Sequence, residues 1–224
     1  AAIHALWAHG QPESGERLAQ AGLSALIQPG ENFGVTDNSL LYGRFRALLF
    51  TGSMGGAAEL ATATYRRGVE SRWARSRPYW AYCLGLHAFW AGRVRAALDW
   101  LQEANLRPMY ADPAFIQLSA TATLAMAGIL AGEASLAASA LKELESLREG
   151  YPINHAWVKR AKAWGALSAG ASDKGLAMLD EAASDCRVGG YAAMEAVLLH
   201  DIARFGTPDN VSARLTDIAA GSEG

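Results

Sequence analysis

The hydrophobic pattern of this chain is interrupted at a series of glycines. Each glycine ends one apolar stretch, and a polar residue or two then leads into a second apolar stretch, as in GLHAFWAGRVRAALDWLQEA (85–104). A glycine inside a helix costs about 1 kcal/mol relative to alanine, so each break is more simply interpreted as a turn between two helices. Neighbouring breaks lie 36 to 42 residues apart, at Gly10, Gly52, Gly92, Gly132, Gly170 and Gly206.

The stretch that follows each break carries small or apolar residues at fixed positions. The residues five places after the glycines are Gly15, Ala57, Ala97, Ala137, Gly175 and Val211. Those nine places after them are Ala19, Ala61, Leu101, Leu141, Leu179 and Leu215. Residues spaced by four share one face of a helix, so this pattern predicts the buried face of the second helix in each unit.

The stretch that precedes each break also has helical spacing, and none shows the strict alternation of a half-buried strand. Segments rich in Pro, Gly, Asn and Asp fall between the units, at 27–39, 105–113, 147–154 and 184–190. We therefore predict an all-α fold, a right-handed superhelical array of about six antiparallel helical hairpins. The array forms a single domain over 1–224, because no segment is long enough to act as a linker.

Composition narrows the class of protein. Charged residues make up 19% of the 224 residues and the formal net charge is −2, so nothing in the overall charge attracts nucleic acid or an anionic membrane. The two cysteines are far apart, which favours a reducing compartment over a disulfide framework. We expect a cytoplasmic protein that neither enters a membrane nor contacts nucleic acid directly. The chain does not begin with Met, and we expect it to be a fragment of a longer protein.

The third unit resembles a tetratricopeptide repeat. Its small and apolar positions stand at that family's spacing, at Gly85, Gly92, Ala97, Leu101 and Ala104. The resemblance is incomplete, because the period exceeds 34 residues, Ala81 stands where the family has an early Trp, and the closing proline is displaced to Pro108. The resemblance implies an α-solenoid whose first helices line a concave face.

A narrower resemblance lies at the end of the chain. The segment AAMEAVLLHDIARFGTPDNVSARLTDIAAGSEG (192–224) is similar to one in large ATP-binding, LuxR-type transcription regulators of the MalT-like group, and RALLFTGSMGGAAELA (46–61) looks like their repeats. The resemblance implies a non-catalytic sensor or scaffold region that receives a small inducer or a partner protein. That family's nucleotide-binding and DNA-binding domains have no counterpart here, because no G-x-x-x-x-G-K-[ST] motif and no recognition helix is found.

Other candidate motifs have simpler interpretations. The Gly-rich TGSMGGAAE (51–59) lacks the Lys-Ser/Thr pair of a phosphate-binding loop and coincides with a turn. The five histidines do not form the His-x3-His spacing of a helical metal site, and the His200–Asp201 pair lacks further ligands. Cys83 lies in an apolar helical context and reads as a core thiol. We therefore expect no metal, no cofactor and no catalytic group in this chain.

An arginine-rich segment, YRRGVESRWARSRPYW (65–80), has two interpretations. Arginine and aromatic side chains together can bind phosphate and stack on bases, but they also pack on one another where one repeat ends and the next begins. The negative net charge and the lack of a second basic run favour packing.

Aromatic residues are the strongest functional signal. If the first helix of each unit lines the concave face, the register predicts a groove that binds a peptide or a small organic molecule such as a sugar. The alternative is that the same rings only fill the core. A free-standing adaptor for a protein partner is the second functional hypothesis. The predicted groove residues are Tyr42, Arg46, Phe50, Tyr79, Tyr82, Phe89, Trp90, Trp157, Arg160 and Trp164.

Overall fold

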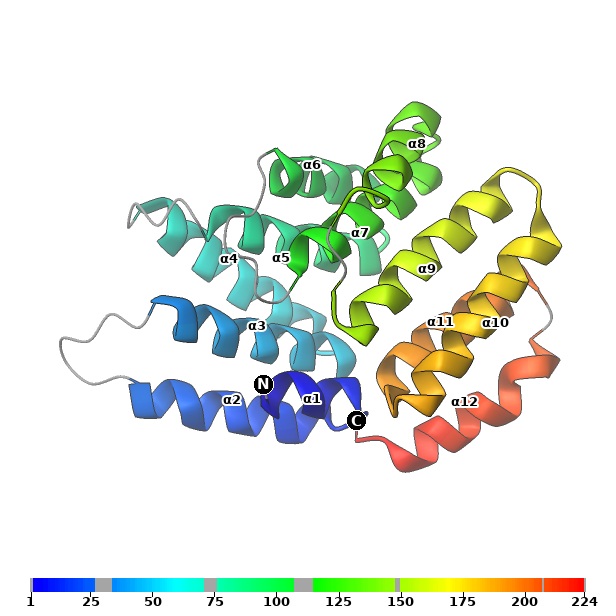
Figure 1. The fold of residues 1–224 in the computed structure, drawn as a ribbon. Helices are drawn as coiled ribbons and strands as arrows, with labels where there is room; N and C mark the ends of the chain where they lie inside the picture. The colour runs from blue at the N-terminus through cyan, green and yellow to red at the C-terminus, as the bar shows by residue number, and fades with distance from the viewer. Residues whose placement is uncertain are drawn as a thin grey trace.

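The chain is all-helical throughout the part that the computed structural model describes, which is residues 2–26, 34–70, 76–106, 115–147, 150–206 and 208–223. Consecutive helices pack side by side (Figure 1). The helices are α1 (Ala2–Ala8), α2 (Pro12–Leu26), α3 (Gly34–Phe50), α4 (Met54–Glu70), α5 (Arg77–Trp90), α6 (Val94–Asn105), α7 (Ile116–Ala131), α8 (Ala134–Glu143), α9 (Pro152–Ser168), α10 (Ser172–Val188), α11 (Ala192–Phe205) and α12 (Asp209–Gly221).

The predicted glycine turns lie between the helices of each pair. At Gly92, φ is +70°, a left-handed conformation that glycine adopts without a steric penalty. The Arg93 amide then donates to the Ala88 carbonyl at 2.8 Å, the 6→1 hydrogen bond of a Schellman motif. Four other predicted glycines also have a positive φ: Gly10, Gly52, Gly132 and Gly170. Gly206 follows α11 but has φ −129°, so the last turn has a different conformation.

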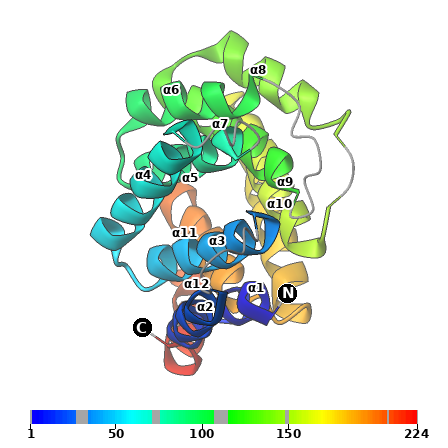
Figure 2. The same ribbon diagram turned by 90° about the vertical axis from the view of Figure 1, so that its left-hand side faces the viewer.

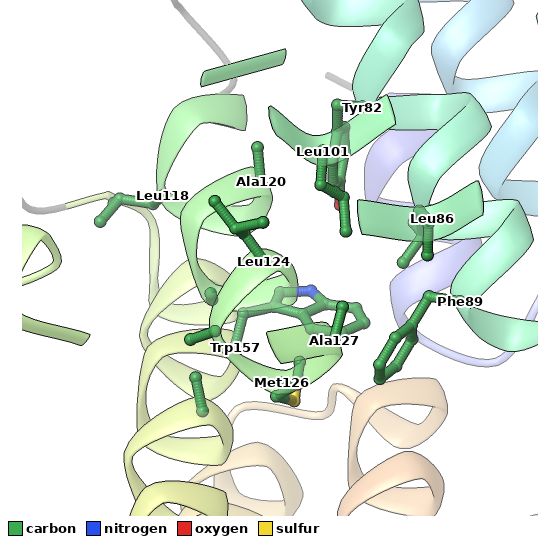
Figure 3. Close-up of a cluster of buried hydrophobic side chains, with 14 of the residues drawn as sticks. Tyr82, Leu86, Phe89, Leu101, Leu118, Ala120, Leu124, Met126, Ala127 and Trp157 are labelled. Carbon is green, nitrogen blue, oxygen red and sulfur yellow. The ribbon is translucent and has the colours of Figure 1, made fainter. Parts of the chain in front are cut away.

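The small residues after these turns allow the paired helices to approach closely. All six residues at the fifth position are buried, as the sequence predicts. A Cβ added at Gly85 on α5 would lie 2.7 Å from Leu101 Cγ on α6, so even a methyl group would clash there. Figure 3 shows the resulting core, in which Leu101 lies beside side chains of α5 and α7. The pattern therefore encodes close packing between the helices of a pair.

The odd-numbered helices form an inner ring. Contacts join α1 to α3, α5 to α7, α7 to α9, and α9 to α11, and an Arg46–Tyr82 hydrogen bond joins α3 to α5. The even-numbered helices α2, α4, α6 and α8 lie outside this ring (Figure 2). The burial agrees with this arrangement, because α7 buries most of its length whereas α8 buries only Ala137 and Ala140 within its helix.

The two ends of the chain meet and close the ring. Helix α1 contacts α11, and His9 Nδ1 donates to the Gly190 carbonyl at 2.6 Å. The Glu223 carboxylate accepts hydrogen bonds from the Ser14 amide at 2.8 Å and from the Ser14 hydroxyl at 2.6 Å. These hydrogen bonds lower the pKa of Glu223. The interior faces of the odd-numbered helices are therefore enclosed rather than spread along an open surface.

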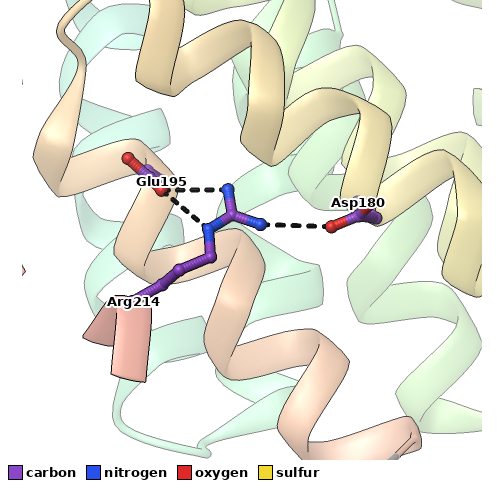
Figure 4. A network of polar contacts seen from close by, with 3 residues as sticks. All are labelled: Asp180, Glu195 and Arg214. Atoms are coloured by element: carbon purple, nitrogen blue, oxygen red, sulfur yellow. Dashed lines mark hydrogen bonds and ion pairs between the residues drawn. The ribbon is translucent and has the colours of Figure 1, made fainter. Parts of the chain in front are cut away.

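Helix α12 is held by a shared arginine. Arg214 donates to Glu195 on α11 through Nε at 3.2 Å and Nη2 at 3.0 Å, and to Asp180 on α10 through Nη1 at 3.2 Å (Figure 4). Glu195 is buried, so the arginine compensates a carboxylate that has lost its hydration.

Some predicted boundaries were wrong. Residues 34–39 belong to α3, residues 152–154 to α9 and residues 184–188 to α10, although the sequence pattern predicts turns in all three stretches. Asp, Asn, Ser and Gly in these stretches resemble turn residues, but the packing of whole helices overrides such local preferences. Residues 27–33, 107–113 and 148–149 of the predicted turns lie outside the described residues. No helix in the described ranges is both long and apolar enough to span a bilayer.

Candidate functional site

The ten predicted groove residues lie on the inner helices α3, α5 and α9. Three of them, Phe50, Tyr79 and Trp90, are half-buried. The other seven are buried, so their side chains pack on one another instead of lying open as platforms. The buried residues are Tyr42, Arg46, Tyr82, Phe89, Trp157, Arg160 and Trp164.

Arg46 lies in a cluster of aromatic rings. Its Cζ is 4.4 Å from the Trp7 ring centroid, 5.2 Å from that of Trp157 and 5.4 Å from that of Phe50. Trp7 and Phe50 are themselves stacked, with centroids 5.3 Å apart. The side chain is only 1% exposed, so these cation–π contacts act with little screening by water.

Arg160 occupies a similar position on α9 but has a counter-ion. Its Nε donates to Asp201 Oδ2 at 2.6 Å and its Nη2 donates to Asp201 Oδ1 at 3.1 Å, a bidentate pair. The Trp164 indole N–H donates to the same Oδ2 at 2.6 Å. Asp201 is fully buried on α11. Asp201 therefore neutralises Arg160 and ties α9 to α11.

Two pockets are lined by predicted groove residues, and the larger of them lies at the C-terminal ends of the inner helices. Its volume is about 680 Å³, within the range of small-molecule sites. Four aromatic rings line it, from Phe50, Phe89, Trp90 and Trp164. Two side chains that can donate hydrogen bonds, His200 and Arg204, also line it. The Arg204 guanidinium lies over the Trp164 ring at 5.4 Å. Arg160 also lines this pocket. Five of the predicted groove residues therefore lie in its wall: Phe50, Phe89, Trp90, Arg160 and Trp164.

The smaller pocket lies at the N-terminal ends of the inner helices and has a volume of about 480 Å³. We call it the Arg46 pocket; the lining residues that matter most are Trp7, Tyr42, Arg46, Tyr151, Trp157 and Tyr191. Burial raises the pKa of the Tyr42 phenol well above its usual value. Burial also raises the pKa of Tyr82, which touches Arg46, although the arginine acts in the opposite direction. Both phenols are therefore neutral at physiological pH.

Several donors in this region have no acceptor within the described part of the chain. Arg46 Nη1 donates to the Tyr82 hydroxyl at 3.3 Å, whereas Arg46 Nε and Nη2 have no hydrogen-bond partner among the described residues. The indole Nε1 of Trp7 also lacks one. Buried donors of this kind are uncommon, and each needs an explanation.

Sequence reasoning missed two residues of this interior. Trp7 stands three positions before Gly10, the same register as Phe89 before Gly92, so the glycine alignment contained the signal for it. In the sequence, Asp201 stands out only as the neighbour of His200 in a candidate metal dyad, and nothing in the local sequence identifies Arg160 as its partner. The predicted residues Tyr79 and Tyr82 are not among the lining residues of either pocket. The Tyr79 ring packs edge-on against Tyr42 instead.

The other candidate motifs have structural roles where they are described. Tyr65 donates to Glu103 at 2.6 Å and Arg77 donates to the same carboxylate at 3.0 Å, so these parts of the arginine-rich segment hold α4, α5 and α6 together. Residues 71–75 of that segment lie outside the described residues. Cys83 is buried, and burial raises the pKa of its thiol well above the usual value. No cluster of three His, Cys, Asp or Glu side chains among the described residues could hold a metal ion.

Comparison of the chain with known protein families, with curated proteins and with solved structures finds no match.

Proposed function

We propose that this chain is a non-catalytic sensor module that binds a small organic molecule inside its ring of helices. One observation carries the proposal: aromatic and arginine side chains from α1, α3, α5 and α9 converge on the interior and line two pockets of about 680 and 480 Å³. Small-molecule sites have this size, and they combine apolar walls with a few polar groups. The same interior disfavours catalysis, because its buried carboxylate, Asp201, is already bound to Arg160 and Trp164.

We propose further that the helix pairs are repeats of a right-handed superhelical array that closes on itself. The recurring glycine turns and the buried small residues after them support this proposal. Because Glu223 and Ser14 join the two ends, a ligand in the interior would be surrounded by several repeats at once. Such a ligand could stabilise one closure of the ring over another, which is how a sensor converts binding into a signal.

The proposed setting is the helical-repeat region of a LuxR-type, MalT-like regulator. The similarity of residues 192–224 and 46–61 to segments of such regulators supports it. The full-length gene tests the setting: a phosphate-binding-loop motif upstream and a helix-turn-helix downstream are expected. A gene that ends close to this segment at both sides would favour a free-standing adaptor.

Ligand binding itself is tested with the purified chain. A thermal-shift screen of chemically diverse small molecules should yield compounds that raise the melting temperature, as binding to the folded state must. A crystal structure of the protein with the best compound should then show it between the odd-numbered helices. The proposal is wrong if no compound stabilises the protein, or if the bound compounds lie on the outer helices.

A further inference from the structure

Arg46 and Arg160 form a contrasting pair within one interior. Both are buried and both guanidinium groups lie over the Trp157 ring, with Cζ to centroid distances of 5.2 and 5.4 Å. Arg160 has a carboxylate on its Nε–Nη2 edge, whereas the same edge of Arg46 has no partner in the described part of the chain. One arginine is therefore neutralised and the other leaves a buried positive charge.

The neighbouring tryptophans repeat the contrast. The Trp164 indole N–H shares Asp201 with Arg160, and the Trp164 ring centroid is 5.5 Å from the Arg160 Cζ. The Trp7 indole N–H has no acceptor in the part of the chain that the structure describes, and the Trp7 ring centroid is 4.4 Å from the Arg46 Cζ. An arginine and a tryptophan thus occur twice, and within the described part of the chain their Nε, Nη2 and indole N–H donors share a carboxylate in one case and have no acceptor in the other. Arg160 Nη1 also has no partner there, so the contrast lies in the Nε–Nη2 edge.

The surroundings of Arg46 favour an anion. Among the described residues that line the Arg46 pocket there is no Asp or Glu, and the only side chain that accepts from Arg46 is the neutral Tyr82 hydroxyl. A charge that is buried without a counter-ion is strongly disfavoured, and the uncompensated donors add to that cost. A ligand that brings a negative charge would remove both penalties on binding.

Resting on the proposed function, we infer that the Arg46 pocket binds a small carboxylate with a planar, aromatic body. The carboxylate would accept hydrogen bonds from Arg46 Nε and Nη2 and from Trp7 Nε1, as Asp201 does from Arg160 and Trp164. A bidentate guanidinium–carboxylate pair is also among the strongest hydrogen-bonded contacts in proteins. Because both side chains are almost fully buried, the carboxylate would reach their donors only if the neighbouring rings shift.

The remainder of the pocket matches an aromatic body. Tyr42, Tyr151, Trp157 and Tyr191 line it, and aromatic rings of this kind pack well on a flat ligand. Tyr151 is 57% exposed, so the wall of the pocket reaches the protein surface there. The volume of about 480 Å³ suits a molecule of one or two rings rather than a peptide.

The inference is tested with matched acids and amides. Isothermal titration would compare acetate, benzoate and indole-3-acetate with benzamide and indole-3-acetamide at millimolar concentration. We expect an aromatic acid to bind the unaltered protein at least tenfold more tightly than its amide, because charged hydrogen bonds are lost in the amide. Binding of acid and amide with equal affinity, or no binding of any of the acids, would overturn the inference.

Variants assign the effect to the site. Arg46→Met should weaken binding of the aromatic acid at least tenfold and leave the affinity for the amide unchanged. Arg46→Lys should retain only part of the affinity for the acid, because lysine cannot bind a carboxylate in a bidentate manner. Trp7→Phe should weaken acid binding by a smaller factor. Arg187→Met is the control: Arg187 is exposed at the end of α10, and its loss also removes one positive charge without touching the pocket.

The outcomes separate this inference from the proposed function. Circular dichroism and the melting temperature establish that each variant folds. Acid binding that survives Arg46→Met shows that the acid binds at another site. Acid binding that falls equally in Arg187→Met shows that the overall charge of the protein and not the Arg46 pocket is responsible. Either result refutes the inference. If a neutral compound binds inside the ring and the carboxylates do not, the inference fails while the proposed function stands. If nothing binds in the interior, both fail.

Discussion

Replacement of Asp201 tests most directly how much the buried Arg160–Asp201 ion pair stabilises the fold. Asp201 has no exposed surface, and it accepts three hydrogen bonds, two from Arg160 and one from Trp164. Asp201→Ala would leave the Arg160 guanidinium buried with no counter-ion, and would leave the indole N–H of Trp164 without an acceptor. After the substitution, Arg160 would be a buried arginine without a carboxylate partner, as Arg46 is within the described residues.

The expected loss in the free energy of unfolding is large. Breaking a buried ion pair by removing one partner costs about 3–5 kcal/mol. For a chain of this length that corresponds to a fall in melting temperature of roughly 6–20 °C. The double variant Asp201→Ala, Arg160→Met removes both charges and retains only the unsatisfied indole, which costs about 1–3 kcal/mol. The double variant should therefore be more stable than Asp201→Ala alone.

Urea unfolding followed by far-ultraviolet circular dichroism measures these differences, provided that the slopes agree between variants. Arg46→Met supplies the converse case, because it removes a buried charge that has no counter-ion among the described residues. That variant should be as stable as the unaltered protein or more so when no ligand is present. The reasoning is refuted if Asp201→Ala costs less than about 1 kcal/mol, or if the double variant is no more stable than Asp201→Ala.

Three further predictions concern packing and pH. Ala97→Leu should destabilise the protein by about 1–3 kcal/mol, because Ala97 is fully buried between paired helices, and an unchanged melting midpoint would contradict this packing. Trp164→Ala should lower the free energy of unfolding by about 3–5 kcal/mol, measured with urea, because Trp164 is buried. Trp90 is half-buried, so Trp90→Ala should cost clearly less. Equal losses would show that both rings serve only to fill the core. Burial and the neighbouring Arg93 lower the pKa of His87. As the pH falls, His87 therefore takes up a proton in the unfolded chain before it does so in the folded protein, so stability should decrease below about pH 6.5. His87→Gln should flatten this dependence in melting curves recorded at a series of pH values. An unchanged slope in that variant would assign the pH effect elsewhere.

The helix pairs could be predicted because their signals are local. Gly92 marks a turn through its own backbone conformation, and Ala97 and Leu101 mark a buried face through their spacing. These features depend on neighbouring residues only, so a single sequence contains them. The boundary at 184–188 was missed because Ser and Asp there resemble turn residues although they continue α10.

The interior could be predicted only in part. The register placed Arg46, Trp157 and Arg160 on inner helices, but it did not reveal that the ring closes and buries them. Closure depends on contacts between the two ends of the chain, such as Ser14 with Glu223, whose positions differ by 209 residues. The difference between a paired Arg160 and an unpaired Arg46 depends on Asp201, which reaches α9 only after the repeats have stacked.

The most direct measurement is a crystal structure of the protein soaked with 4-bromobenzoate, with the bromine located by its anomalous scattering. We expect one bromine in the Arg46 pocket, with the carboxylate on Nε and Nη2 of Arg46 and within hydrogen-bond distance of Trp7 Nε1. A bromine only on the outer helices, or a carboxylate that avoids Arg46 within the pocket, would contradict it.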